Sequence, residues 1–182
     1  MSQAFIADEL KARLLEHAPN PVLPAKMLEL SPAGIQKKYQ DAEFDCVIAP
    51  LVLMDQEKWR VFFTEIQRIL APNGFFLFST LGNEAPNELE ILGDTLLKAG
   101  FQLPVVDREI LQWQYDNMNV LLKDLEQSGL NEKLVRVTKE SSGDIIATFD
   151  VMYGYALGSL INSLTPGKIE IPVENIKIRK PL

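Results

Sequence analysis

Two continuous apolar runs, with an amphipathic helical pattern between them, constrain this chain most. The runs span residues 44–53 and 75–80, and neither alternates between apolar and polar residues as a half-exposed strand does. The segment between them has apolar side chains at three- and four-residue spacing: Trp59, Phe62, Phe63, Ile66, Ile69 and Leu70. Strands covered on both faces and joined by helices are typical of a parallel sheet, so we predict an α/β fold.

The same criteria predict the remaining elements. We expect helices at residues 4–17, from Ser31-Pro32 through Ile35 to Tyr39, through Leu89 to Leu97, and at 117–127. We expect further strands at residues 26–30, 105–115 and 145–155, turns at 71–74 and 165–167, a polar loop at 133–144, and an extended piece at 169–178. Gly100 is placed as a helix C-terminal glycine.

These elements predict one sheet, mostly parallel, in which the strand at 145–155 is antiparallel, with helices on both faces. At 182 residues the chain has the length of one domain. We divide it into a helical N-terminal segment (1–25), a core (26–160) and a C-terminal extension (161–182).

Composition excludes several classes of function. The net charge of −7 disfavours nucleic acid as a partner, because binding to duplexes depends on neutralising phosphates. The chain has neither an apolar run of membrane-spanning length nor a secretory signal pattern, so we expect a cytoplasmic protein without membrane contact. One cysteine, Cys46, and one histidine, His17, leave no disulfide framework and no Cys/His metal site.

Several motifs resemble those of class I S-adenosylmethionine (SAM)-dependent methyltransferases. Residues 44–48 (FDCVI) are similar to the family's "FDLV" fourth strand, and residues 65–80 are similar to its "RVLKPGG" helix, turn and fifth strand. Residues 96–101 (LLKAGF) resemble its "LLxxAGF". Two further motifs are specific to a smaller group of proteins: residues 115–129 (YDNMNVLLKDLEQSG) and 148–158 (TFDVMYGYALG). They resemble the BioC branch of malonyl-acyl-carrier-protein O-methyltransferases in biotin synthesis, and the related complex I assembly methyltransferase.

The resemblance implies where a cofactor would bind. Glu29 holds the position of the acidic residue that takes the ribose hydroxyls of SAM, at the end of the family's second strand. Asp41 and Ala42 correspond to the adenine-side "DA", and Pro50 and Leu51 to the segment that lines the methyl-donor site. The resemblance assigns no catalytic residue here, and Tyr155 stands where the branch often has histidine.

One departure from the family pattern leads to two hypotheses. The family's glycine-rich turn, D-x-G-x-G-x-G, follows its first strand, but the first glycine of this sequence is Gly34, after Glu29. The third strand has no counterpart either, so we expect a truncated Rossmann-like class I methyltransferase fold. Our first hypothesis is a degenerate pseudo-methyltransferase that binds no SAM and serves as an accessory or binding protein. The alternative is an active malonyl-acyl-carrier-protein type enzyme completed by a partner or a second protomer.

The missing strand also has a structural consequence. Either the strand at 26–30 moves beside the strand at 44–53, or a sheet edge is left exposed. Because exposed edges recruit further strands, we expect a homodimer through a sheet edge, with another protein as a possible partner.

Overall fold

The computed structural model describes residues 12, 25–31, 34–35, 37–51, 56–83, 85–127, 130, 132–139 and 143–159. Within the helix predicted at 4–17 only Ala12 is described, and it is helical and exposed. The predicted turn at 165–167 and the extended piece at 169–178 lie outside the described residues.

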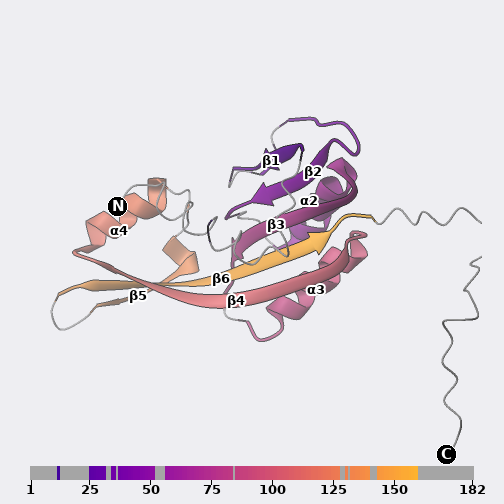
Figure 1. Ribbon diagram of the computed structural model, residues 1–182. Helices are drawn as coiled ribbons and strands as arrows, with labels where there is room; N and C mark the ends of the chain where they lie inside the picture. The colour runs from indigo at the N-terminus through magenta and orange to yellow at the C-terminus, as the bar shows by residue number, and fades with distance from the viewer. Residues whose placement is uncertain are drawn as a thin grey trace, which may run out of the picture.

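A six-stranded sheet forms the centre of the molecule (Figure 1). Its order is β1-β2-β3-β6-β4, and β5 pairs with one end of β6. Strands β1, β2 and β3 are parallel, and β6 runs antiparallel to β3, β4 and β5, so β6 alone has the opposite direction, as predicted. The strands are β1 (Met27–Glu29), β2 (Phe44–Ala49), β3 (Leu70–Leu81), β4 (Gln102–Tyr115), β5 (Val135–Lys139) and β6 (Ile145–Leu157).

Helices lie on both faces of this sheet. Helices α2 (Gln56–Ile69) and α3 (Glu88–Lys98) pack on one face, and α4 (Met118–Gln127) packs on the other, towards the far end of β4 and β6 (Figure 1). A short 3-10 helix, η1 (Glu132–Leu134), precedes β5. Within the described part of the chain, no helix combines the length and apolar character needed to cross a membrane.

Aromatic rings fill the core between the sheet and α2. Phe63 of α2 lies 5.3 Å from Phe78, and Phe76 stacks on Phe78 with ring centroids 4.8 Å apart. Phe101, after α3, closes the group at 5.7 Å from Phe76. Offset and tilted ring pairs of this kind are favourable beyond the area that they bury. The buried side of α2 (Trp59, Phe62, Phe63, Ile66 and Ile69) is therefore the predicted one.

The strands β4, β5 and β6 continue past the rest of the sheet as an arm (Figure 1). Leu121 and Leu125 of α4 are buried against the arm, where Trp113 lies 4.5 Å from Phe149. Asn117 begins α4, because its side-chain oxygen accepts hydrogen bonds from the backbone N–H groups of Asn119 and Val120.

Two of the predicted elements are wrong. No helix runs through Ile35 to Tyr39 among the described residues: Gly34 has a φ of 76°, outside the helical region, and its N–H donates to the Ser31 carbonyl at 2.8 Å. The stretch 133–144 is not a loop throughout, because β5 pairs with β6 from Val135↔Phe149 to Lys139↔Ile145. The polar composition hid this strand, whose residues are exposed except Val135.

The predicted turn at residues 71–74 lies inside β3. The ladder with β2 is irregular there, passing from Phe44↔Leu70 to Cys46↔Phe75, and Asn73 has a φ of 61°. The chain does bend at the predicted place, but as an irregularity within a strand.

Candidate functional site

Strand β1 lies directly beside β2. The pairing runs from Met27↔Cys46 through Leu28↔Val47 to Glu29↔Ile48, and the Leu30 N–H extends it by donating to the Ile48 carbonyl at 2.8 Å. This confirms the first of the two arrangements expected after loss of a strand. Residues 30–43 connect β1 to β2, and their described part contains no helix and no named strand.

The carboxyl ends of β1 and β2 bring together three of the five predicted cofactor residues. Glu29 ends β1 and is exposed, whereas Pro50 and Leu51 follow β2 and are buried. Ligands of open α/β sheets bind at such carboxyl ends, so this edge is the candidate site suggested by the fold.

The backbone after β2 is already engaged within the protein. The Leu51 N–H donates to the Ser79 hydroxyl oxygen on β3 at 2.9 Å, and both residues are buried. Leu51 has a φ of 50°, a strained conformation for a residue with a side chain, and its side chain belongs to the core on the α4 face. This segment therefore offers a ligand few polar groups.

Asp41 and Ala42 lie at the other end of β2. Both precede Phe44 and pack against the C-terminal end of α2, where the Ala42 N–H donates to the Arg68 carbonyl at 2.9 Å. The Arg68 guanidinium forms ion pairs with Asp41 and with Glu65, and lowers the pKa of Glu65 through their hydrogen bond. The structure therefore separates Asp41 and Ala42 from Glu29 and Leu51 by the length of β2.

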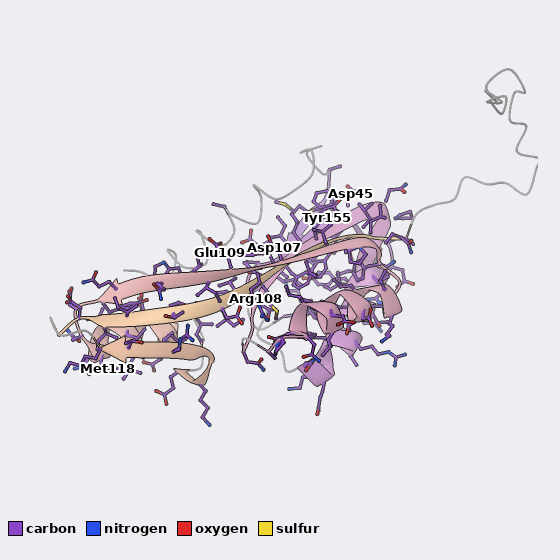
Figure 2. The ribbon with its side chains drawn as sticks, turned by 90° about the horizontal axis from the view of Figure 1, so that it is seen from below. Asp45, Asp107, Arg108, Glu109, Met118 and Tyr155 are labelled. Carbon is purple, nitrogen blue, oxygen red and sulfur yellow. The ribbon has the colours of Figure 1, made fainter. Side chains whose placement is uncertain are left out.

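A second polar group, which sequence reasoning missed, lies where β3 ends. Arg108 of β4 contacts two buried carboxylates: its Nη2 lies 2.9 Å from Glu88 Oε2, and its Nε lies 3.1 Å from Asp150 Oδ1. Arg108 points to the side of β4 opposite Asp107 and Glu109 (Figure 2). The sequence contains one indication of this group: Asp150 is an acidic residue within the apolar run of β6.

The other candidate side chains are structural. Cys46 is buried, and burial raises its thiol pKa to about 12, so it is a neutral core residue as expected. Burial also raises the pKa of Tyr155, and the Tyr153 hydroxyl lies 3.4 Å from Glu109 Oε2. The described residues contain no group of three metal-ligating side chains.

Comparisons with known proteins found similarities to one family. A family described as "Methyltransferase domain" matches residues 6–78. A Methylovorus sp. protein named "Malonyl-[acyl-carrier protein] O-methyltransferase" is 30% identical over 131 positions, with 52% of this chain and 44% of that protein covered. The chain is similar to class I methyltransferases and, among them, to the BioC-like branch.

Two further similarities were found. "Arginine-hydroxylase NDUFAF5, mitochondrial" of Dictyostelium discoideum is 28% identical over 175 positions, with 82% of this chain and 40% of that protein covered. The YcgJ protein of Bacillus subtilis aligns with a TM-score of 0.44 at 13% identity, covering 70% of this chain and 68% of that structure. The chain spans less than half the length of these two curated relatives.

The Methylovorus alignment also shows an internal difference within the family. It extends over 131 positions but includes only 52% of the 182 residues of this chain. This chain contributes fewer residues than the alignment has positions. The relative therefore has residues within the matched span that this BioC-like chain lacks.

Proposed function

We propose that this BioC-like chain is a pseudo-methyltransferase, which does not bind SAM by itself and acts as an accessory or binding protein. The observation that carries the proposal is the direct pairing of β1 with β2. The resemblance places the strand with the glycine-rich turn in the middle. The strand of the acidic residue lies on one side of it, and the "FDLV" strand lies on the other. Here these two strands are hydrogen-bonded to each other.

The ladder leaves no position between β1 and β2 for another strand. It continues on both sides of the named residues, because the Asp45 N–H donates to the Lys26 carbonyl at 2.9 Å at one end and the Leu30 N–H donates to the Ile48 carbonyl at 2.8 Å at the other. A strand inserted here would have to break these backbone hydrogen bonds.

The predicted cofactor residues fit SAM poorly in this arrangement. Glu29 could still accept hydrogen bonds from ribose hydroxyls, but Asp41 is paired with Arg68 at the far end of β2. The Leu51 N–H is bonded to Ser79, and Leu51 packs into the core. One carboxylate at an exposed edge is a weak basis for cofactor affinity.

Isothermal titration calorimetry and thermal melts with millimolar SAM and S-adenosylhomocysteine test this proposal. A ligand at 100 times its dissociation constant adds about 2.7 kcal/mol, which raises the melting midpoint of a chain this size by several degrees. We expect no binding heat and no shift, whereas the Methylovorus relative measured alongside should show both. A shift that the E29Q variant removes would overturn the proposal.

The alternative function is an active SAM-dependent methyltransferase of the malonyl-acyl-carrier-protein type. The position of Glu29 beside Pro50 and Leu51 favours it, since this part of the carboxyl edge is in place. A partner or a second protomer would then supply the rest of the cofactor site. In that case SAM binding would appear only with the partner present or would strengthen with protein concentration.

A further inference from the structure

One part of the sheet has a buried face that no described helix covers. Cys46 and Ile48 of β2 and Leu77 of β3 belong to the core on the α4 side, and each is only 1% exposed. Helix α4 itself lies along the arm, away from β2 and β3 (Figure 1). Helices α2 and α3 lie on the opposite face of the sheet, and so do Ile35 and Tyr39 of the connection between β1 and β2. Since side chains on an open sheet face stay partly exposed to water, another segment of this chain has to cover these three.

Two stretches that lie largely outside the described residues are long enough to form the cover: residues 1–24 and 160–182. In the second, prolines at positions 166 and 172 interrupt any long helix, and apolar residues alternate with other residues as in an extended chain. An extended segment would place unpaired backbone N–H and C=O groups against an apolar face, whereas a helix pairs them within itself. The first stretch contains the helical pattern, with apolar residues four apart at Ile6, Leu10 and Leu14.

Ala12 shows which side of this predicted helix faces water. It is the one described residue of the first stretch, and it is helical and exposed. At about 3.6 residues per turn, Ala12 points about 160° away from both Leu10 and Leu14. Amphipathic helices turn their apolar stripe towards the core and the opposite side towards water. The exposure of Ala12 is therefore what a helix with Leu10 and Leu14 against the protein would give.

The dimensions of the predicted helix match this face of the sheet. A helix over residues 4–17 is about 21 Å long, and the six residues of β2 span about 20 Å. Residues 18–24 can bridge up to about 23 Å between the helix and β1. This link is long enough to bring the helix back over the sheet beside the strand that follows it, which is the usual relation of helix and strand in α/β folds.

We propose that residues 4–17 form an amphipathic helix that docks on the α4 side of β2 and β3, with Leu10 and Leu14 facing the sheet. The occupant is the chain's own segment, because the link at 18–24 holds it beside its own β1 at a high effective concentration. The docked helix closes the apolar face over Cys46, so a partner of an accessory protein has to use another surface. The proposal does not rest on the lack of SAM binding.

Paramagnetic relaxation measured by NMR tests the position of the segment in the folded chain. Cys46 is the only cysteine in the sequence, so the double variant C46A/A12C carries one nitroxide label, on the exposed side of the segment. We expect the label to broaden the backbone amide signals of Ile48 and Leu77 strongly, and to leave the signal of Asp94, in α3 on the opposite face, sharp. Sharp signals for Ile48 and Leu77 would place the segment elsewhere and overturn the proposal.

A mixed sample distinguishes the chain's own segment from that of a second copy. Spin-labelled C46A/A12C protein without isotopes is mixed with 15N-labelled C46A protein that carries no spin label. Only broadening between chains is then visible, and we expect the signals of Ile48 and Leu77 to stay sharp. Broadening as strong as within one chain would assign the segment to a second copy and contradict the proposal.

The reactivity of the Cys46 thiol with the reagent DTNB gives a second test, with two matched variants. L10D and A12D add the same carboxylate to the segment, but only Leu10 lies on the side proposed to dock. We expect L10D to raise the labelling rate of Cys46 roughly tenfold, because the apolar contact that closes the face is lost and local opening becomes more frequent. A12D should change the rate by less than about twofold.

Circular dichroism reports whether each variant is folded. A folded L10D protein whose Cys46 reacts as slowly as that of A12D would refute the docking of this stripe. The relaxation experiment leaves Leu10 unchanged, so it decides the question if L10D does not fold.

Discussion

Gly154 is where a single added methyl group should be most damaging. It lies on β6 opposite Phe78 of β3 and Val106 of β4, and a Cβ built on it would lie 2.1 Å and 2.2 Å from two carbons of the Phe78 ring. Ordinary carbon contacts are about 3.5–4.0 Å, so the overlap exceeds an ångström. The ring cannot easily retreat, because Phe78 is 1% exposed and packs between Phe76 and Phe63.

We therefore expect G154A to destabilise the protein by about 2–3 kcal/mol. Overpacking a core costs roughly 1–3 kcal/mol or more, and the intrinsic advantage of alanine over glycine in a strand, about 0.5–1 kcal/mol, offsets part of this. At about 2–4 °C per kcal/mol for a chain of this size, the melting midpoint should fall by roughly 5–10 °C. Urea unfolding and a thermal melt measure the two quantities.

G93A is the matched control. Gly93 lies within α3, and the nearest atom to an added Cβ is 3.8 Å away on Val106, so alanine should fit and stabilise the helix by about 0.5–1 kcal/mol. The double variant G154A/F78L removes the ring that alanine strikes, and it should lose less stability than the two single changes added together. If G154A melts at the wild-type temperature, the packing assigned to this glycine is wrong.

Three further predictions concern charge, titration and assembly. R108Q leaves Glu88 and Asp150 without their shared cation and should cost about 3 kcal/mol in urea unfolding, whereas R60Q should cost almost nothing; equal losses would refute the role of Arg108. Burial raises the Cys46 thiol pKa from 9.0 to about 12, so the free energy of unfolding should decline as pH rises from 9 to 12. Urea unfolding at alkaline pH measures this decline, and the C46A variant should show less of it. We also propose a homodimer through the outer edge of β4. Light scattering at high micromolar concentration should give twice the chain mass, and V105K, at an exposed position of β4, should lower the measured mass. A monomer mass for the unmodified protein would contradict the proposal.

Apolar periodicity was sufficient to predict the elements with a strong buried side. The stripe from Trp59 to Ile69 and the run from Phe75 to Thr80 match α2 and half of β3, because burial on one or both faces leaves a pattern in the residues themselves. Strand β5 left no such pattern. Its residues other than Val135 are exposed, and pairing with β6 decides its conformation.

The candidate site was less predictable because it depends on strand order. The resemblance placed Glu29, Asp41 and Leu51 around one ligand, but β2 holds Asp41 and Leu51 at its opposite ends. The group of Arg108, Glu88 and Asp150 joins residues from β4, α3 and β6, and no local spacing relates them. Asp150, in the middle of an apolar strand, was the one local indication that a buried charge needed a partner.

The connection between β1 and β2 is too short to contain the family's third strand. Parallel neighbours need a crossover of a dozen residues or more, and residues 30–43 only just provide it. A crossover helix followed by a third strand would need more residues than this segment contains. The strand that the resemblance places between β1 and β2 is the one with the glycine-rich turn, which precedes the acidic strand and is not part of this connection. In the structure β1 pairs directly with β2, and Glu29 lies opposite Ile48. The direct pairing, and not the length of the connection, therefore accounts for the proposed lack of SAM binding. Restoring the connection without restoring that strand should therefore not restore binding, and calorimetry with SAM on such a variant would test it.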